Sequence, residues 1–122
     1  AFLDSNIAVY AVDPREASRS KQAVSRKLFL DRDCFLSTQV LMETFSVLLR
    51  KDLMDADGAH AYVRRLGLLP VVQIDRDDVL EALELRSVYR IGHWDGLILR
   101  AAEKAQAPIL YTEDLNHGQT YG

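Results

Sequence analysis

Short apolar runs alternate with longer segments of helical periodicity along the chain. The apolar runs predict buried strands at residues 1–4, 34–36, 71–74 and 108–111. Apolar residues recur every three or four positions in the segments between them, which predicts helices at 5–12, 17–30, 39–51, 76–89 and 94–105. A further helix is expected to begin at Asp55 or Asp57 and to end at Gly67.

The order of these elements predicts the fold class. Strands and helices alternate, and each strand is a continuous apolar run rather than an alternation of apolar and polar residues. Such strands are typical of a parallel sheet that helices bury on both faces, so we expect an α/β fold. In such sheets the ligand site lies at the carboxyl edge of the strands.

The composition is that of an ordinary globular domain. The 122 residues are 48% hydrophobic and 27% charged, which excludes a disordered tail, and no linker divides residues 1–122 into two domains. No apolar run approaches the roughly 20 residues of a membrane-spanning helix, and the N-terminus does not resemble a secretory signal. The single cysteine, Cys34, can form no internal disulfide, so we expect a cytoplasmic protein.

The charge balance argues against one common kind of nucleic-acid binding. The chain has 18 acidic and 15 basic residues, which gives a formal net charge of -3. Proteins that hold nucleic acid by neutralising its phosphates are usually strongly basic. If this chain binds nucleic acid, something other than bulk positive charge must hold the phosphates.

Several acids follow the strands, where the fold class would place a site. Asp4 ends the first expected strand, and Glu113 and Asp114 directly follow the last one. Neighbouring parallel strands can bring such carboxylates side by side at one edge of the sheet. The simpler alternative is that each acid only caps the helix or turn that follows it.

Glu43 interrupts a helix that is otherwise largely apolar. We expect Leu41, Phe45 and Leu48 to form the core stripe of this helix, but the neighbours of Glu43 one turn away are apolar as well. A partly buried carboxylate needs a partner or a cation. An ion pair with Arg50, or a solvated position, is the structural alternative to a functional role.

Asp95 opens the last expected helix. An acid in the first turn is stabilised by the helix dipole, which alone could explain it. We expect Trp94 beside it to be a core residue or the wall of a groove rather than a stacking platform, and His93 to be a loop residue.

If Asp4, Glu43, Asp95 and Asp114 converge, their repulsion requires a cation, and oxygen ligands favour Mg²⁺ or Mn²⁺. Such sites usually act on phosphates.

Four segments resemble, in order, the motifs of the PIN-domain nucleases. Residues 2–6, Phe-Leu-Asp-Ser-Asn, resemble the opening hydrophobic-Asp-x-Asn motif, and residues 37–43 resemble the helix that carries the family's glutamate. Residues 93–98, His-Trp-Asp-Gly-Leu-Ile, resemble its aromatic-Asp-Ala-Leu-Ile segment. Residues 110–119 are similar to the closing Thr/Ser-Glu-Asp-Leu segment, especially that of the VapC-type toxins of bacterial and archaeal toxin–antitoxin systems.

The resemblance implies a three-layer PIN-like fold with a parallel sheet of about four to five strands. It also implies a Mg²⁺- or Mn²⁺-dependent endoribonuclease that hydrolyses RNA phosphodiester bonds, is held inactive by an antitoxin protein and forms a homodimer. The family's metal-binding catalytic acids correspond to Asp4, Glu43, Asp95 and Asp114. Supporting polar positions, which would orient an acid or a water, correspond to Asn6 and Thr112. We add three basic residues that could contact substrate phosphates, although exposed basic residues are often only solvated: Arg50, Lys51 and Arg100.

The chain departs from the family pattern at two places. Gly96 stands where the family more often has Ala, which should loosen the start of that helix slightly. The chain ends at Gly122, before the family's final strand, so either the sequence is short or the sheet has one edge strand fewer.

Other function classes lack a residue or loop that they need. Phosphatases with Asp-x-Asp after the first strand are excluded because the pair here is Asp4 and Asn6. A signalling receiver domain would need a lysine directly after a late strand, and none follows Tyr111. No glycine-rich nucleotide loop or serine-hydrolase elbow occurs. A PIN-fold module that binds or processes RNA without a toxin role remains the alternative.

Overall fold

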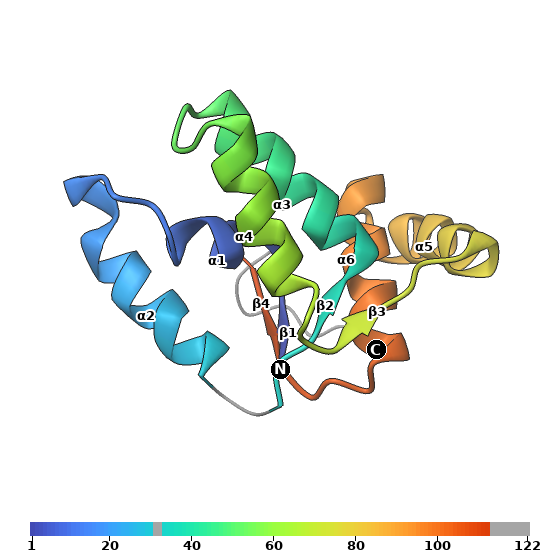
Figure 1. The fold of residues 1–122 in the computed structure, drawn as a ribbon. Coiled ribbons are helices and arrows are strands. Elements are labelled where there is room, and N and C mark those ends of the chain that lie inside the picture. Colours follow the sequence, from blue (N-terminus) through green and yellow to red (C-terminus); the bar gives the residue numbers. More distant parts are fainter. Residues whose placement is uncertain (31–32, 113–122) are drawn as a thin grey trace.

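Four short parallel strands lie at the centre of the computed structural model, which describes residues 1–30 and 33–112 (Figure 1). These strands are β1 (Phe2–Leu3), β2 (Leu36–Ser37), β3 (Val71–Val72) and β4 (Leu110–Tyr111). β1 pairs with β4 and β2 with β3, and a bridge between Phe2 and Phe35 joins the two pairs. The spatial order is therefore β3-β2-β1-β4, which confirms the expected parallel sheet.

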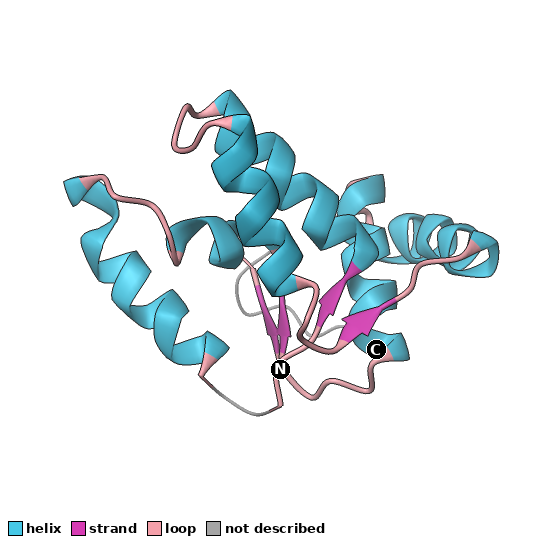
Figure 2. Ribbon diagram, in the orientation of Figure 1, coloured by secondary structure: helices cyan, strands magenta, loops and turns pink. Residues whose placement is uncertain are grey.

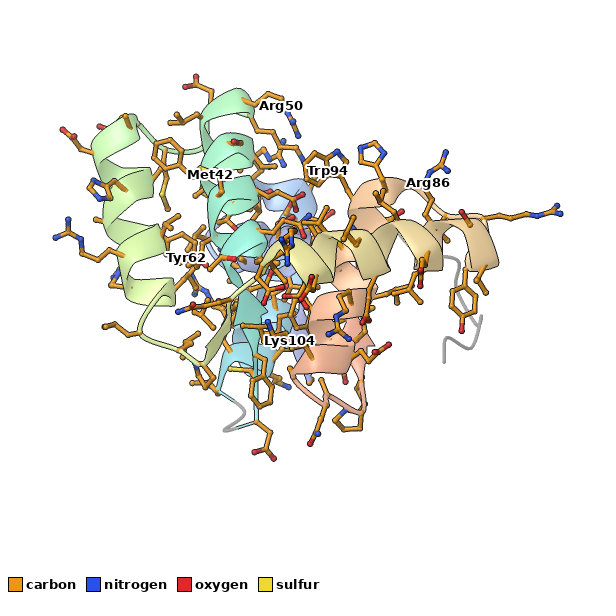
Figure 3. All side chains as sticks on the ribbon, turned by 90° about the vertical axis from the view of Figure 1, so that its right-hand side faces the viewer. Met42, Arg50, Tyr62, Arg86, Trp94 and Lys104 are labelled. Carbon is orange, nitrogen blue, oxygen red and sulfur yellow. The ribbon has the colours of Figure 1, made fainter. Side chains whose placement is uncertain are left out.

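Helices cover both sides of the strands. Figures 1 and 3 show α3 and α4 on one side and α6, with α5 beside it, on the other, and Figure 2 shows how little of the chain is strand. This is the expected three-layer α/β arrangement. The helices are α1 (Ser5–Tyr10), α2 (Arg19–Phe29), α3 (Thr38–Arg50), α4 (Ala56–Leu66), α5 (Arg76–Tyr89) and α6 (His93–Lys104), and a 3-10 turn, η1 (Glu16–Ser18), precedes α2.

Polar side chains begin four of these helices, because each accepts a backbone N–H that the first helical turn leaves without a partner. Asp4 accepts from Ser5 at 2.6 Å and begins α1, and Ser37 accepts from Val40 at 3.2 Å and begins α3. Asp55 and Asp75 begin α4 and α5 in the same way. The expected helix starts after the strands are thus confirmed.

The core lies between the strands and the inner faces of the helices. The strand residues Phe2, Leu3 and Leu36 are fully buried. The expected core stripe of α3 is wrong in detail: Val40, Thr44 and Leu48 are fully buried, and Leu41 and Phe45 lie half-buried at the edge. Thr44 fits this apolar stripe because its hydroxyl donates to the carbonyl of Val40 at 2.7 Å.

Tyr62 fastens α4 to α1, the helix that begins at Asp4. Its hydroxyl donates to the carbonyl oxygen of Ala8 at 2.6 Å, and the side chain is buried. Burial raises the pKa of Tyr62 to about 12, so the hydroxyl remains a donor at physiological pH. This contact limits the movement of α1 at the carboxyl end of β1.

Gly96 lets α5 and α6 approach closely. A Cβ atom at this position would stand 2.4 Å from the backbone oxygen of Ala82, which is far inside van der Waals contact. The expectation that this glycine only loosens the helix is therefore incomplete, since the absent side chain also permits the packing. None of the described helices is long and apolar enough to cross a membrane.

Candidate active site

Asp4 is a buried carboxylate where two neighbouring strands end. It follows β1 directly and is 2% exposed. Oδ1 accepts the backbone N–H of Ser5 at 2.6 Å, and Oδ2 accepts the hydroxyl of Thr112, the residue after β4, at 2.6 Å. Both donors are neutral, and within residues 1–30 and 33–112 Asp4 forms no ion pair.

Ser5 connects Asp4 to Glu43. Its hydroxyl donates to Oε2 of Glu43 at 3.2 Å, while its backbone N–H holds Asp4. Gln39, one turn earlier on α3, donates its side-chain amide to Oε1 of Glu43 at 2.8 Å. The two acids therefore share Ser5 as a hydrogen-bond donor, although they are 39 positions apart in the sequence.

The alternative partner for Glu43, Arg50, lies elsewhere. Figure 3 shows Arg50 at the far end of α3, where its side chain is exposed. No ion pair of Arg50 occurs in the described part of the chain. Glu43 is thus held by the hydroxyl and amide donors named above, and Arg50 and its neighbour Lys51 are exposed cations at the end of α3.

Two amide side chains beside these acids have buried polar atoms without a partner. Among the described residues, neither Nδ2 nor Oδ1 of Asn6 makes a hydrogen bond, and Oε1 of Gln39 accepts none. Buried polar groups without a partner are costly, and in native proteins such groups are usually explained by a bound water, ion or ligand. Two of the three atoms are oxygens, which are the ligand atoms that hard cations prefer.

The other two predicted acids are placed less closely. Asp95 lies half-buried in the first turn of α6, where Gly92 begins the helix without a side-chain cap. Asp114 lies outside the described residues. Within the described ranges, no three acids, histidines or cysteines stand close enough together to hold a metal ion. The convergence of all four acids stays a prediction.

Arg100 has a different place from the phosphate contact that the sequence suggested. Its guanidinium lies 2.9 Å from Asp78, 2.9 Å from Glu81 and 2.8 Å from Glu103. The hydrogen bond with Asp78 raises the pKa of Arg100 despite partial burial. Three carboxylates therefore pair with this side chain at the contact between α5 and α6, and a phosphate would have to compete with them.

Asp78 is a second buried aspartate, and it has cationic partners. It is 1% exposed, and it accepts from Arg100 at 2.9 Å and from Lys104 at 2.7 Å. Burial opposes its ionisation, but the hydrogen bonds from Lys104, the Asp75 backbone and Arg100 outweigh burial and hold the pKa of Asp78 well below its usual range. Asp78 can therefore be compared with Asp4, which is equally buried but accepts only from neutral donors among the described residues.

Sequence reasoning missed Ser5 and Gln39. Ser5 stands between the two motif residues Asp4 and Asn6, and Gln39 stands one helical turn before Glu43. Both spacings were visible signals, because i and i+4 residues share a helix face and the first residue of a helix lies beside its cap.

The family model of the PIN domain matches residues 1–122. The chain belongs to the PIN domain family. Among solved structures, VapC20 of Mycobacterium tuberculosis, a sarcin–ricin loop cleaving toxin, is similar to this PIN domain with a TM-score of 0.72 and 20% identity, over 93% of this chain and 88% of that chain. A toxin–antitoxin complex from Klebsiella pneumoniae is similar with a TM-score of 0.65 and 18% identity, over the same shares of 93% and 88%. A search of curated proteins finds no match.

Proposed function

We propose that this PIN domain is a metal-dependent endoribonuclease that hydrolyses RNA phosphodiester bonds. The observation that carries the proposal is the linked pair of acids, Asp4 and Glu43, at the carboxyl edge of a parallel sheet. Nothing cationic neutralises Asp4 within the described chain, so the site keeps a negative charge that a divalent cation would balance. A nuclease site built from carboxylates needs such a cation, because the acids and the RNA phosphates are both negative.

The ligands that we propose for Mg²⁺ or Mn²⁺ are carboxylates. The oxygen-rich surroundings, including the unpartnered amide oxygen of Asn6, fit a hard cation better than zinc. When bound, the metal would lower the pKa of a water and offset charge on the phosphate. Thr112 and Ser5 fix the orientation of the Asp4 carboxylate, and Gln39 and Ser5 fix that of Glu43. The proposed ligand set is Asp4, Glu43, Asp95 and Asp114.

We further propose that the protein is the toxin of a toxin–antitoxin pair, acting in the cytoplasm as a homodimer until an antitoxin protein inactivates it. The support is the likeness of the whole fold to a VapC toxin and to a toxin–antitoxin complex. This likeness covers 93% of the chain in both cases.

RNA cleavage by matched aspartate variants tests the nuclease activity. The purified protein is incubated with RNA in Mg²⁺ or Mn²⁺, in EDTA, and as Asp4→Asn or Asp78→Asn. We expect cleavage only with metal, a loss of about a thousandfold in Asp4→Asn, and wild-type cleavage per folded molecule in Asp78→Asn. Equal cleavage by wild type and Asp4→Asn would overturn the assignment, as would full activity in EDTA.

Growth of a bacterial host tests the toxin role separately. Induced wild type should arrest growth, and Asp4→Asn at the same cellular level should not. If a small protein is encoded beside this gene, its co-expression should relieve the arrest, and it should co-purify with the chain. Metal-dependent RNA cleavage without growth arrest would instead support an RNA-processing module.

A further inference from the structure

The turn between α5 and α6 presents two aromatic rings to solvent. Trp94 is 59% exposed, so it is not a core residue, and His93 is exposed beside it. The two ring centroids lie 5.2 Å apart with planes tilted by 49°. His93 lies in the first turn of α6 rather than in a loop. Apolar side chains exposed singly are ordinary, whereas exposed rings that lie side by side are typical of a surface that binds a partner.

Two arginines precede these rings along the chain. Arg86 and Arg90 lie at the end of α5 and are exposed. Neither guanidinium forms an ion pair within the described residues, whereas Arg15 and Arg100 are paired with acids. The two arginines are therefore available to an external anion.

The backbone of Arg90 has a conformation that is unusual for a residue with a side chain. Arg90 adopts φ 54° and ψ 46°, the left-handed conformation that usually favours glycine at the end of a helix. An arginine at this position gives up some local stability. The same conformation occurs at Asp52 and Gln106, so it supports the inference only together with the exposed charge.

This turn lies on the same side of the molecule as the carboxyl ends of the strands. Figure 1 shows the strands running toward the side on which α6 begins, and Figure 3 places Trp94 and Arg86 toward that side, with Lys104 toward the other end of α6. Trp94 also directly precedes Asp95, one of the predicted acids. A ligand on these rings would extend beside the proposed site.

We propose that Arg86, Arg90, His93 and Trp94, here called the aromatic–arginine surface, bind an unpaired stretch of the RNA substrate, with a base stacked on the indole of Trp94. This proposal rests on the proposed nuclease function and names the part of the RNA that the site recognises. Unpaired bases stack on aromatic side chains, and arginines contact the phosphates between them. Because the whole chain carries a net charge of -3, a local group of unpaired cations is the kind of surface that it needs.

Fluorescence of Trp94 tests the stacking without measuring cleavage. Trp94 is the only tryptophan of the chain, so its emission reports this surface alone. The full chain in EDTA is titrated with an unpaired oligoribonucleotide and with a duplex of the same length. We expect saturable quenching by the unpaired RNA and much weaker quenching by the duplex. Equal quenching by both, or none by either, overturns the proposal. A shift with protein concentration alone does so too, because it indicates contact between copies.

Kinetics of ring variants separate binding from chemistry. Trp94→Leu should raise KM for an RNA with an unpaired target about tenfold, because stacking on one base is lost, and should change kcat less than twofold. Trp94→Tyr keeps an aromatic ring and should restore most of the affinity. A fall in kcat at unchanged KM would show that Trp94 acts only by positioning Asp95.

The backbone at Arg90 provides a matched pair of variants. Arg90→Gly removes the charge and relieves the left-handed conformation, so the melting temperature should be unchanged or higher while KM rises severalfold. It should also reduce the slope of log KM against log salt concentration by roughly 0.7, the value for one phosphate contact to a single strand. Gln106→Gly, at φ 55°, should change melting in the same direction and leave KM at the wild-type value.

These outcomes are distinct from failure of the proposed function. If wild type cleaves no RNA with metal, the nuclease function fails, and the fluorescence titration still decides whether unpaired RNA binds. If wild type cleaves RNA but Trp94→Leu keeps its KM and Arg90→Gly keeps both its KM and its salt slope, the aromatic–arginine surface alone is overturned.

Discussion

Two buried aspartates of this PIN domain differ in what surrounds them. Asp4 and Asp78 are 2% and 1% exposed, and each accepts a backbone N–H near the start of a helix. Asp78 also accepts from the side chains of Arg100 and Lys104. Asp4 accepts only neutral donors, Ser5 and Thr112, among the residues that the structure describes.

The difference separates a structural acid from a functional one. Cationic partners at Asp78 hold its pKa low, so its charge fastens α5 to α6. A buried carboxylate without a cation destabilises a fold, since the lost hydration is only partly replaced by hydrogen bonds. We therefore expect Asp4 to serve catalysis rather than stability, and Asp78 to serve stability.

The largest expected effect is on catalysis at Glu43. Glu43→Gln keeps the size of the side chain and an oxygen for the Ser5 hydroxyl, but it removes the charge. RNA cleavage should fall by about a hundredfold to a thousandfold, while the free energy of unfolding changes by less than about 1 kcal/mol. Cleavage rates and urea unfolding measure the two quantities. The exposed Glu84→Gln on α5 is the control, and a similar loss in both variants would contradict the role of Glu43.

The free energy of unfolding should respond differently to the same substitution at the two aspartates. Asp78→Asn removes charged hydrogen bonds to Arg100 and Lys104 and should lower the free energy of unfolding by about 2 kcal/mol. Asp4→Asn keeps a side chain that can cap α1 and removes a buried charge, so metal-free stability should change by less than about 1 kcal/mol or rise. Urea unfolding in EDTA measures both. A larger loss in Asp4→Asn would show that the contrast is false.

Acid should narrow the stability gap between wild type and Asp78→Asn. The folded-state pKa of Asp78 lies below the unfolded value of about 3.9, so its contribution is fully present above that pH and is lost as the pH falls through the folded pKa. The free energy of unfolding of both proteins is measured at about pH 7, 5, 4 and 3. The difference between them should be constant down to about pH 4 and should shrink below it. The paired Asp13, whose pKa Arg15 lowers, is present in both proteins and cancels in the difference. A gap that grows in acid would contradict the assigned direction.

The parts of this structure that local rules determine were predictable. Asp55, Asp75 and Ser37 begin helices because their side chains accept backbone N–H groups, and this depends on a few neighbouring residues. Continuous apolar strands were enough to predict the parallel sheet. Asp4 was found because it follows a strand at the expected carboxyl edge of the sheet, and Glu43 because it interrupts an otherwise largely apolar helix.

Features that depend on contacts between distant elements were not predictable. The requirement for Gly96 comes from the backbone of Ala82 on another helix, and the role of Arg100 comes from acids of α5 and its own helix. The exposure of Trp94 depends on where α6 begins relative to α5. The position of Ser5 beside Asp4 was visible in the sequence, but its hydrogen bond to Glu43 was not, because that contact forms only in the folded chain.

Ser5 gives the smallest and sharpest test of the contrast, because it acts on Asp4 through its backbone and on Glu43 through its hydroxyl. Ser5→Ala removes only the hydroxyl, so the cap on Asp4 remains and Glu43 loses one of its donors. We expect cleavage to fall about fivefold to tenfold, equivalent to one neutral hydrogen bond of about 1 kcal/mol. Ser5→Thr should restore most of the activity because it restores the hydroxyl, whereas Ser46→Ala on the exposed face of α3 should have no effect. Wild-type cleavage by Ser5→Ala would show that the Ser5 hydroxyl is not needed to orient Glu43, and the linked pair of acids would then be two independent ones.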